Sequence, residues 1–417
     1  MKRPDQRVVI TGIGVLSPNG NSLDAFWQNT LDCVSGIGEI TRIDMEDSPV
    51  KIAGEIKDFD LKRYLPSDHV IKPKRMGLHT QFGIAAAHMA IKDAGLNLDI
   101  LRRSEPLSVF LGVSTSAIDV IEKNYNVMLK HGYRKLSPYG VSASQPHAVA
   151  NEIVNTLNVK TYRTTYSSAC PAGLESIARG METIRKKQSR FVICGGVDAP
   201  ITQITLSGMY LAQLATNFKT APEKSSRPFD ANRECGVLSE GAGLFILESL
   251  ESALSRGAKP YAEVLAYGNY ADDVDTPPGS GLTQSMQYAL DEAAMLAGEI
   301  EYINAHGPGH PVIDAIETKC IKETFGDRAY KIPISSIKGV IGNPLAASGA
   351  LQCAASAMAL TKGIIPPTAN YEVPDPECDL FYTPNFPLQR DIENVMINLH
   401  GLGGGNSSLI LRKVQTR

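Results

Sequence analysis

Cys170 is the residue best placed for catalysis, because it directly precedes Pro171 at the predicted start of a helix. Proline is favoured at the first helical position, where its missing N–H costs nothing. The helix dipole and the unpaired N–H groups of a helix N-terminus stabilise a thiolate, so we expect a lowered pKa for Cys170. The same N–H groups can donate to the oxyanion that forms when a thioester is attacked. A buried structural cysteine is the alternative that this segment leaves open.

Two segments in the C-terminal part of the chain carry further polar side chains beside glycines. His306 and Gly307 follow the strand-like run Tyr302–Asn304, and reactive groups of α/β proteins collect at such strand ends. Lys338 precedes a turn that ends in Gly342–Asn343. The pattern G-x-x-x-x-G-K-[ST] is absent there, which excludes a phosphate loop of that type. A lone histidine is more often structural than catalytic, so this spacing alone leaves both roles open.

The elements that must position these residues alternate between strands and helices. Short apolar runs bounded by glycines predict strands at Val8–Ile10, Leu107–Val113, Arg190–Gly195, Leu244–Glu248, Tyr302–Asn304, Ile332–Ser335 and Val395–Leu399. Amphipathic stretches between them predict helices at Gln81–Ala94, Pro171–Lys186, Thr283–Ala297, Val312–Phe325 and Gly349–Leu360. Strands that alternate with helices of this length are typical of an α/β fold.

One strand pattern occurs twice along the chain. Arg7–Gly12 and Tyr261–Gly268 are similar, and Ser249–Lys259 separates the second copy from what precedes it. We therefore predict two halves of related topology, residues 1–250 and residues 251–417. The cysteine lies in the first half, and the histidine, lysine and asparagine lie in the second.

Composition and charge exclude several classes of function. The formal net charge of the 417 residues is −3, so no overall basic charge favours nucleic acid or an anionic membrane surface. No uninterrupted apolar stretch reaches the roughly 20 residues of a membrane-spanning helix. The seven cysteines lack the C-x-x-C spacing of metal sites, which predicts reduced thiols, no bound metal and a cytoplasmic protein.

Several segments, in order along the chain, resemble the β-ketoacyl-ACP synthases, in particular the elongating enzymes of fatty acid and type II polyketide systems. The resemblance is carried by Arg7–Pro18, Ser167–Cys170, Arg227–Asp230, Glu240–Gly243 and the glycine turn at residues 401–405. Asp198–Thr202 is particularly similar to discrete polyketide ketosynthases. The resemblance covers essentially the whole chain. It implies an α/β, duplicated thiolase fold in five αβαβα layers, as a homodimer or as a heterodimer with a related subunit.

The resemblance also implies a role for each candidate residue. Cys170 would accept an acyl chain from an acyl carrier protein, and His306 would promote decarboxylation of a malonyl unit and stabilise the enolate oxygen. Lys338 and its acidic partner Glu317 would organise the charges behind the histidine. The backbone N–H groups of Cys170 and His400 would form the oxyanion hole. The chain would need no cofactor of its own, because the phosphopantetheine arm arrives on the carrier protein.

The sequence departs from the family pattern at three places. Asn343 stands where a second histidine is usual, although an amide N–H can donate to an enolate oxygen much as an imidazole N–H does. Pro308 and His310 replace two threonines that contact the pantetheine arm in the family, which implies a different placement of the arm. His400 replaces a gating phenylalanine and adds an imidazole near the pocket, unless only its backbone matters.

Related proteins of the same fold provide the competing functions. A non-catalytic chain-length factor would lack the nucleophile, so Cys170 argues against it, but the missing threonines keep it open. A thiolase would carry a second cysteine in the C-terminal glycine turn, and residues 400–405 contain none. A malonyl-ACP decarboxylase that does not condense also stays open.

Two clusters of basic residues are candidates for binding the carrier protein, because carrier domains are typically acidic. Lys72, Lys74 and Arg75 precede a predicted helix, and Arg134 and Lys135 form the second cluster. Their positions resemble the docking residues of the family. The alternative is ordinary solvated surface charge.

Overall fold

The computed structural model describes residues 6–66, 71–103, 107–217 and 221–415, and its main sheet consists of two five-stranded halves. The first half has the order β5 (Thr161–Tyr166), β4 (Leu107–Gly112), β6 (Phe191–Asp198), β7 (Gly241–Ser249) and β1 (Val8–Leu16). The second half has the order β10 (Ile334–Ser335), β9 (Tyr302–Asn304), β13 (Asn394–Gly401), β14 (Gly405–Arg412) and β8 (Ala262–Ala271). A short antiparallel contact between β1 and β8 joins them.

The second half of the sheet repeats the strand directions of the first. β4 lies between two parallel neighbours, β5 and β6, as β9 lies between β10 and β13. The antiparallel steps from β6 through β7 to β1 correspond to those from β13 through β14 to β8. Equal order and equal directions confirm the duplicated fold predicted from the sequence. The division between residues 250 and 251 stays a prediction.

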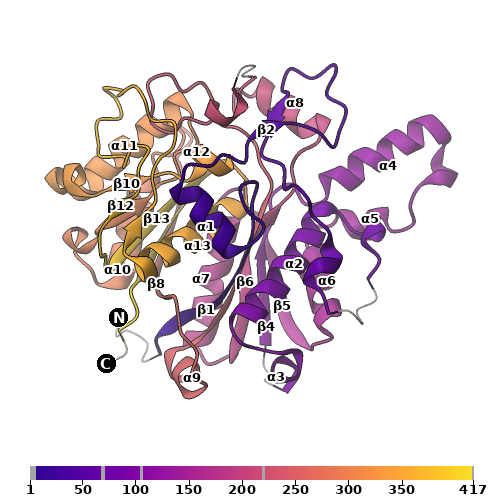
Figure 1. Cartoon of the computed structure of the whole chain (residues 1–417), viewed down its shortest axis with the longest axis horizontal. Coiled ribbons are helices and arrows are strands. Elements are labelled where there is room, and N and C mark those ends of the chain that lie inside the picture. Colours follow the sequence, from indigo (N-terminus) through magenta and orange to yellow (C-terminus); the bar gives the residue numbers. More distant parts are fainter. Residues whose placement is uncertain (1–5, 67–70, 104–106, 218–220, 416–417) are drawn as a thin grey trace.

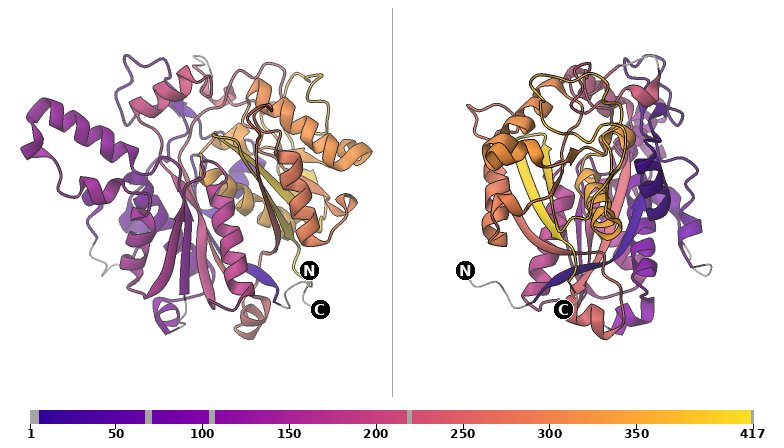
Figure 2. Two further views of the ribbon diagram at one scale, coloured as in Figure 1. Left: turned by 180° about the vertical axis from the view of Figure 1, so that it is seen from behind. Right: turned by 60° about the vertical axis from the view of Figure 1, so that its left-hand side comes forward.

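Helices form three layers that enclose the two halves of the sheet (Figures 1 and 2). The middle layer is α7 (Ala172–Arg185) and α13 (Ala347–Lys362), which contact strands of both halves. α2 (Leu78–Asp93) and α6 (Ala148–Leu157) cover the outer face of the first half. α10 (Leu282–Ala293), with α11 (Pro311–Phe325) packed on it, covers the second. These five αβαβα layers were also predicted.

Small residues allow α13 to lie at the centre of the molecule. Every residue from Ala347 to Leu360 is buried, as a helix between two sheets requires. A Cβ on Gly173 of α7 would lie only 2.5 Å from the carbonyl oxygen of Ala346. The N-terminal ends of α7 and α13 therefore touch, which brings the two halves of the candidate site together.

The remaining elements lie around this core, and one of them projects from it. The shorter ones are α1 (Leu23–Leu31), α3 (Leu98–Arg103), α5 (Gly140–Ser144), α8 (Gln203–Leu211), α9 (Leu250–Ser255), α12 (Lys338–Ile341) and the strand pairs β2 (Gly38–Glu39) with β3 (Ile52–Ala53) and β11 (Ile364–Ile365) with β12 (Leu388–Gln389). α4 (Ile118–His131), which we did not predict, extends away from the body (Figures 1 and 2). None of its side chains is buried. In the described ranges, no helix is long and apolar enough to cross a membrane.

Candidate active site

A cavity of about 680 Å³ lies where the N-terminal ends of α7 and α13 meet the ends of β9 and β13. Cys170, His306, Asn343 and His400 all line it. Apolar side chains complete much of the wall, among them Met209, Leu214, Leu238, Val312, Ile313, Leu345 and Leu402. The fold thus brings together four predicted residues that are separated by up to 230 positions in the chain.

Cys170 lies on a sharp turn between β5 and α7. Ala169 has a left-handed backbone with a φ of 59°, and the helix begins at Ala172, two residues after the cysteine. Pro171 therefore precedes the helix as its N-cap and is not its first residue, a difference within the usual uncertainty of helix ends. The turn presents the thiol at the N-terminal end of α7, as predicted.

Burial raises the pKa of the Cys170 thiol to about 11, which contradicts the lowered pKa predicted for a helix start. The buried Asp198 carboxylate adds to the increase, while Lys338 and the backbone N–H groups of Cys170 and Leu402 oppose it. Only 5% of Cys170 is exposed. The cost of a buried thiolate therefore exceeds the stabilisation from the helix end and the lysine. We therefore expect Cys170 to be a protonated thiol at neutral pH.

The second backbone donor at the cysteine sulfur is Leu402, two residues beyond the predicted His400. His400 lies inside β13 and pairs with Asn406 of β14. The chain turns away from the strand after Gly401, which carries the Leu402 N–H towards Cys170. A Cβ on Gly401 would lie 2.5 Å from Pro171 Cδ, so glycine is what allows the turn to pack here. The structure moves the predicted oxyanion donor from His400 to Leu402.

Glu317 and Lys338 hold the backbone of His306 from opposite sides. The N–H groups of His306 and Gly307 donate to the two carboxylate oxygens of Glu317, each at 2.8 Å. Lys338 Nζ donates to the carbonyl oxygen of His306 at 2.6 Å and to Gln352 Oε1 at 3.1 Å. Gln352 Nε2 in turn donates to the carbonyls of the two residues before His306. This network fixes the strand end that carries the imidazole.

The predicted pairing of Lys338 with Glu317 is therefore indirect. None of the ion pairs between described residues joins these two side chains, and each contacts the His306 backbone instead. Burial raises the pKa of Glu317 and lowers the pKa of Lys338, and their mutual attraction opposes both shifts. The two charges thus stabilise each other across the residue that they hold.

His306 is neutral near pH 7. Burial lowers its pKa well below the usual range, and Lys338 and His400 act in the same direction. A neutral imidazole donates from one ring nitrogen only. Nδ1 of His306 is buried and has no hydrogen-bond partner in the described part of the chain. No hydrogen bond between described residues therefore fixes the ring proton on Nδ1, so Nε2 is free to carry it.

Asn343 is fixed through its backbone and its side chain. Its N–H donates to the Val237 carbonyl at 2.7 Å, and its carbonyl accepts from the Ser239 N–H at 3.1 Å. Ser348 Oγ donates to Asn343 Oδ1 at 3.0 Å. Among the described residues, Nδ2 has no hydrogen-bond partner. The amide is held by its oxygen, and its N–H groups are available to a ligand in the cavity.

His400 provides a second imidazole beside His306. The two ring centroids are 6.1 Å apart and nearly perpendicular. His400 Nδ1 lies 3.0 Å from Asn406 Oδ1. Because Asn406 Nδ2 donates to Tyr270 O, Asp272 Oδ1 and Gly404 O, its oxygen must face the histidine, and Nδ1 must carry the proton. Burial lowers the pKa of His400, so the neutral ring has Nε2 as a hydrogen-bond acceptor.

His310, the other extra histidine of this region, is the N-cap of α11. Its Nδ1 accepts from the N–H groups of Val312 at 3.1 Å and Ile313 at 3.4 Å. Burial lowers the pKa of His310, which keeps Nδ1 unprotonated, as an acceptor must be. His310 and Pro308 also line the cavity. Capping thus accounts for the position of His310. Its ring forms part of the cavity wall, and its Nδ1 is occupied by the helix N–H groups.

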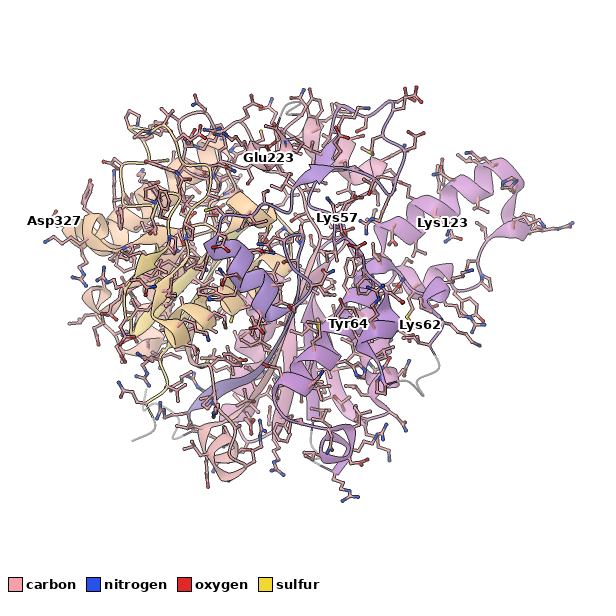
Figure 3. All side chains as sticks on the ribbon, in the orientation of Figure 1. Lys57, Lys62, Tyr64, Lys123, Glu223 and Asp327 are labelled. Atoms are coloured by element: carbon pink, nitrogen blue, oxygen red, sulfur yellow. The ribbon has the colours of Figure 1, made fainter. Side chains whose placement is uncertain are left out.

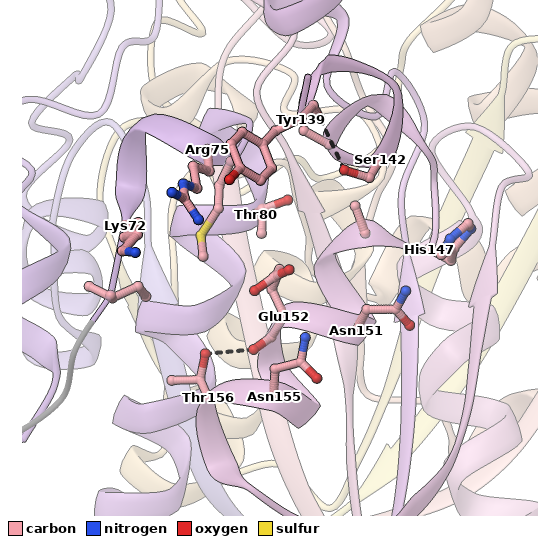
Figure 4. A pocket seen from close by; sticks show the side chains of 14 residues that line it. Lys72, Arg75, Thr80, Tyr139, Ser142, His147, Asn151, Glu152, Asn155 and Thr156 are labelled. Atoms are coloured by element: carbon pink, nitrogen blue, oxygen red, sulfur yellow. Dashed lines mark hydrogen bonds between the residues drawn. The ribbon is translucent and has the colours of Figure 1, made fainter. Parts of the chain in front are cut away.

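The first basic cluster contributes two side chains to the wall of a second cavity (Figure 4). Lys72, Lys74 and Arg75 are exposed on and just before a short 3-10 helix, Pro73–Arg75, that precedes α2. Lys72 and Arg75 line a cavity of about 550 Å³ between this segment, α5 and α6. The Arg75 guanidinium lies 4.2 Å from the centre of the Tyr139 ring. This cation is therefore oriented by its contact with Tyr139, and no ion pair with another described residue holds it.

The second basic cluster lies at the far end of the projecting helix. Arg134 and Lys135 are exposed on a 3-10 helix, Tyr133–Lys135, directly after α4. Lys123 adds an exposed cation on α4 itself (Figure 3). The two predicted docking clusters thus belong to separate elements of the N-terminal half, and both are accessible to solvent.

Sequence reasoning missed three residues of the site. Gln352 was detectable, because a long polar side chain inside a helix of small residues needs buried partners. Leu402 could be identified only from the exact end of β13, and the hydrophobic pattern of a sequence does not determine where a strand ends. Ser348 had no signal in the sequence, since its importance depends on the neighbouring Asn343 side chain.

Known proteins similar to this chain match it over nearly its whole length. The family model for the β-ketoacyl synthase N-terminal domain matches residues 5–253, and that for the C-terminal domain matches residues 261–372. The 3-oxoacyl-(acyl-carrier-protein) synthase 2 of Synechocystis sp. is 35% identical over 414 residues, which cover 98% of this chain and 99% of the relative.

Solved structures of ketosynthases have the same fold. The ishigamide ketosynthase/chain length factor has a TM-score of 0.92 and 32% identity, over 98% of this chain and 100% of that one. A type II PKS acyl-carrier protein in complex with its ketosynthase bound to the hexaketide contains a chain with a TM-score of 0.88 and 26% identity, again over 98% and 100%. The chain described here belongs to the β-ketoacyl synthase family.

Proposed function

We propose that this enzyme catalyses a decarboxylating Claisen condensation between an acyl group carried on Cys170 and a malonyl group on an acyl carrier protein. The observation that carries the proposal is the arrangement around one cavity. A buried thiol with two backbone N–H groups at its sulfur lies opposite two neutral side chains, His306 and Asn343, that can donate to a developing anion.

Acyl transfer is the first step. Cys170 Sγ attacks the carbonyl carbon of an acyl thioester, and the N–H groups of Cys170 and Leu402 donate to the resulting oxyanion. The bond to the pantetheine sulfur breaks, and that sulfur receives the proton that Cys170 loses. Because Cys170 is a thiol at neutral pH, the proton needs an acceptor, and the neutral imidazoles of His306 and His400 line the same cavity.

Decarboxylation and condensation follow. The malonyl carboxylate leaves as CO2, and the electron pair of the broken C–C bond passes into an enolate. The N–H groups of His306 and Asn343 donate to the enolate oxygen, which requires neither group to be charged. The enolate carbon attacks the Cys170 thioester, Sγ leaves, and the product is a β-ketoacyl chain extended by two carbons on the carrier.

The proposed partner is an acyl carrier protein that docks on the basic clusters of the N-terminal half. One solved relative is in complex with an acyl-carrier protein. The carrier supplies the phosphopantetheine arm, so the proposal includes no cofactor held by this chain. The sequence of Asp198–Thr202 favours polyketide over fatty acid assembly. The cytoplasmic location stays a prediction.

We further propose that a second subunit, identical or related, covers the outer edge of the first half-sheet. β5 is the last strand in the order and pairs only with β4 in the described sheet. An unprotected edge strand favours pairing with another chain. Ile121, Tyr125 and Leu129 of α4 are 47%, 53% and 65% exposed, which is unusual for a helix of an isolated domain.

The test supplies the two substrates separately. The enzyme is incubated with acyl carrier protein loaded with an acyl chain, weighed intact, and then given malonyl carrier. We expect an adduct of one acyl group on Cys170, followed by its loss as β-ketoacyl carrier forms. CO2 release without loss of the adduct would indicate a decarboxylase that does not condense. Absence of both adduct and CO2 would indicate a non-catalytic subunit.

A further inference from the structure

Ser348 is the only described side chain that hydrogen-bonds the Asn343 amide, and we propose that it is a positioning residue for the reaction. In this proposal, which rests on the proposed function, the Ser348 hydroxyl holds Asn343 Oδ1 so that Nδ2 faces the enolate. Ser348 is completely buried in the first turn of α13. It does not contact the substrate cavity itself.

The backbone around Asn343 is held in place, which leaves the orientation of the side chain for Ser348 to control. Hydrogen bonds to Val237 and Ser239 hold the Asn343 peptide groups on both sides. Leu345 has a left-handed backbone with a φ of 47°, which turns the chain sharply into α13. This turn brings Ser348 back beside Asn343. With the main chain fixed, the rotation of the side-chain amide is what remains to be set.

The two ends of the amide have opposite effects on an enolate. Nδ2 donates hydrogen bonds, whereas Oδ1 only accepts them. An amide turned by 180° would present Oδ1 to the developing negative charge and would oppose decarboxylation. The Ser348 hydroxyl donates to Oδ1 and so favours the productive orientation.

The experiment measures the two half-reactions of the full-length enzyme separately. Ser348→Ala should lower kcat for CO2 release from malonyl carrier about two- to tenfold, the value of one neutral hydrogen bond, with KM unchanged. Acylation of Cys170 should proceed at the parent rate, because Asn343 has no part in that step. Ser348→Thr keeps the hydroxyl and should restore CO2 release.

A double-mutant cycle separates positioning from packing. If Ser348 acts through Asn343, then Ser348→Ala should have no further effect on CO2 release in an Asn343→Ala background. Ser108→Ala is the matched control. Ser108 is also a buried serine, and it shares a hydrogen bond of 2.6 Å with Ser189 near the start of β4 instead of contacting Asn343. This control should leave both half-reactions unchanged.

Each outcome decides the proposal. Equal losses from Ser348→Ala in the presence and absence of Asn343, or a parental rate for Ser348→Ala beside an impaired Asn343→Ala, would overturn the positioning role and leave the proposed function intact. A parental rate for Asn343→Ala would overturn the catalytic role of the amide and the positioning role together. Loss of acylation in Ser348→Ala would also overturn the positioning role, because a residue that acts only through Asn343 leaves acylation unchanged.

Discussion

The starts of the two central helices differ in how they control reactivity. Each helix follows a turn with a left-handed non-glycine residue, Ala169 before α7 and Leu345 before α13. At α7 the reactive atom has few polar contacts, and burial raises its pKa. Around α13, Lys338 and Gln352 hold the backbone at and before His306, and Ser348 separately holds the Asn343 amide. In the first half, burial favours the protonated thiol of Cys170. In the second half, hydrogen bonds hold the neutral side chain of Asn343 and the backbone of His306 in place.

Under the proposed function, this difference places the group that carries the acyl chain in the first half and the groups that stabilise the enolate in the second. Acyl transfer needs a group whose charge changes during the reaction, and burial makes the uncharged thiol the resting state. Enolate stabilisation needs groups that are already oriented before charge develops, and a rigid network provides that orientation. Substitutions at one helix start should therefore impair one half-reaction and spare the other.

Removal of the nucleophile should have the largest effect. We expect Cys170→Ala to abolish acyl attachment and condensation completely, because no other group in the cavity is proposed to carry the chain. CO2 release from malonyl carrier should continue, since its donors lie in the second half. Intact mass after incubation with acyl carrier measures the first effect, and labelled CO2 measures the second. An acyl adduct on the variant would exclude Cys170 as the nucleophile.

Removal of the Asn343 amide should have the opposite effect: CO2 release should be impaired and acyl attachment to Cys170 should be spared. Asn343→Ala removes one enolate donor, which typically costs on the order of 10²–10³ in rate. Asn343→Leu, similar in size but without hydrogen bonds, should lose as much CO2 release as the alanine variant. Both should still form the Cys170 adduct at the parent rate. If both variants decarboxylate normally, Asn343 is structural, and His306 must act alone or with one of the other two imidazoles of the cavity, His310 and His400.

The order of elements and the residues at their ends could be predicted from the sequence, whereas contacts that depend on a neighbour could not. Alternating strands and helices, with Cys170 and His306 at their ends, follow from local pattern and from resemblance. The pKa of Cys170 was predicted in the wrong direction because a helix start is a local feature, while burial depends on segments far along the chain, such as α13, which begins 177 residues later. Leu402 and Ser348 became visible only when strand ends and turns were placed in space.

The pH dependence of Cys170 alkylation tests the contrast directly. Because the pKa is raised to about 11, the thiolate fraction should increase about tenfold per pH unit, or roughly 100-fold between pH 7 and pH 9. A thiol with a lowered pKa would already be ionised, and its rate would be level over this range. The rate is measured with iodoacetamide and peptide mass spectrometry, which distinguishes Cys170 from the half-buried Cys33 and Cys235. A level profile would restore the prediction made from the helix start.

Carrier docking should be required in both half-reactions, and its expected effect is the smallest. Both the acyl and the malonyl substrate arrive on a carrier, so reversing charge at the docking clusters should slow both steps by the same factor. For Arg75→Glu combined with Arg134→Glu, we expect about a tenfold lower kcat/KM at low salt, because steering by charge is lost. The difference should diminish above physiological ionic strength, where surface charges are screened.

Substrates without a carrier provide the internal comparison for this prediction. Acyl and malonyl thioesters of free pantetheine use the same cavity but not the docking clusters, so the double variant should process them at the parent rate. Lys319→Glu is the matched control, because Lys319 is a well-exposed cation on α11 in the other half, with a side chain that is 75% exposed. A loss confined to one half-reaction would mean that the two substrates dock differently. An equal loss with pantetheine thioesters would mean that the substitutions disturb the cavity, for instance through the contact of Arg75 with Tyr139, and that neither cluster is a docking surface.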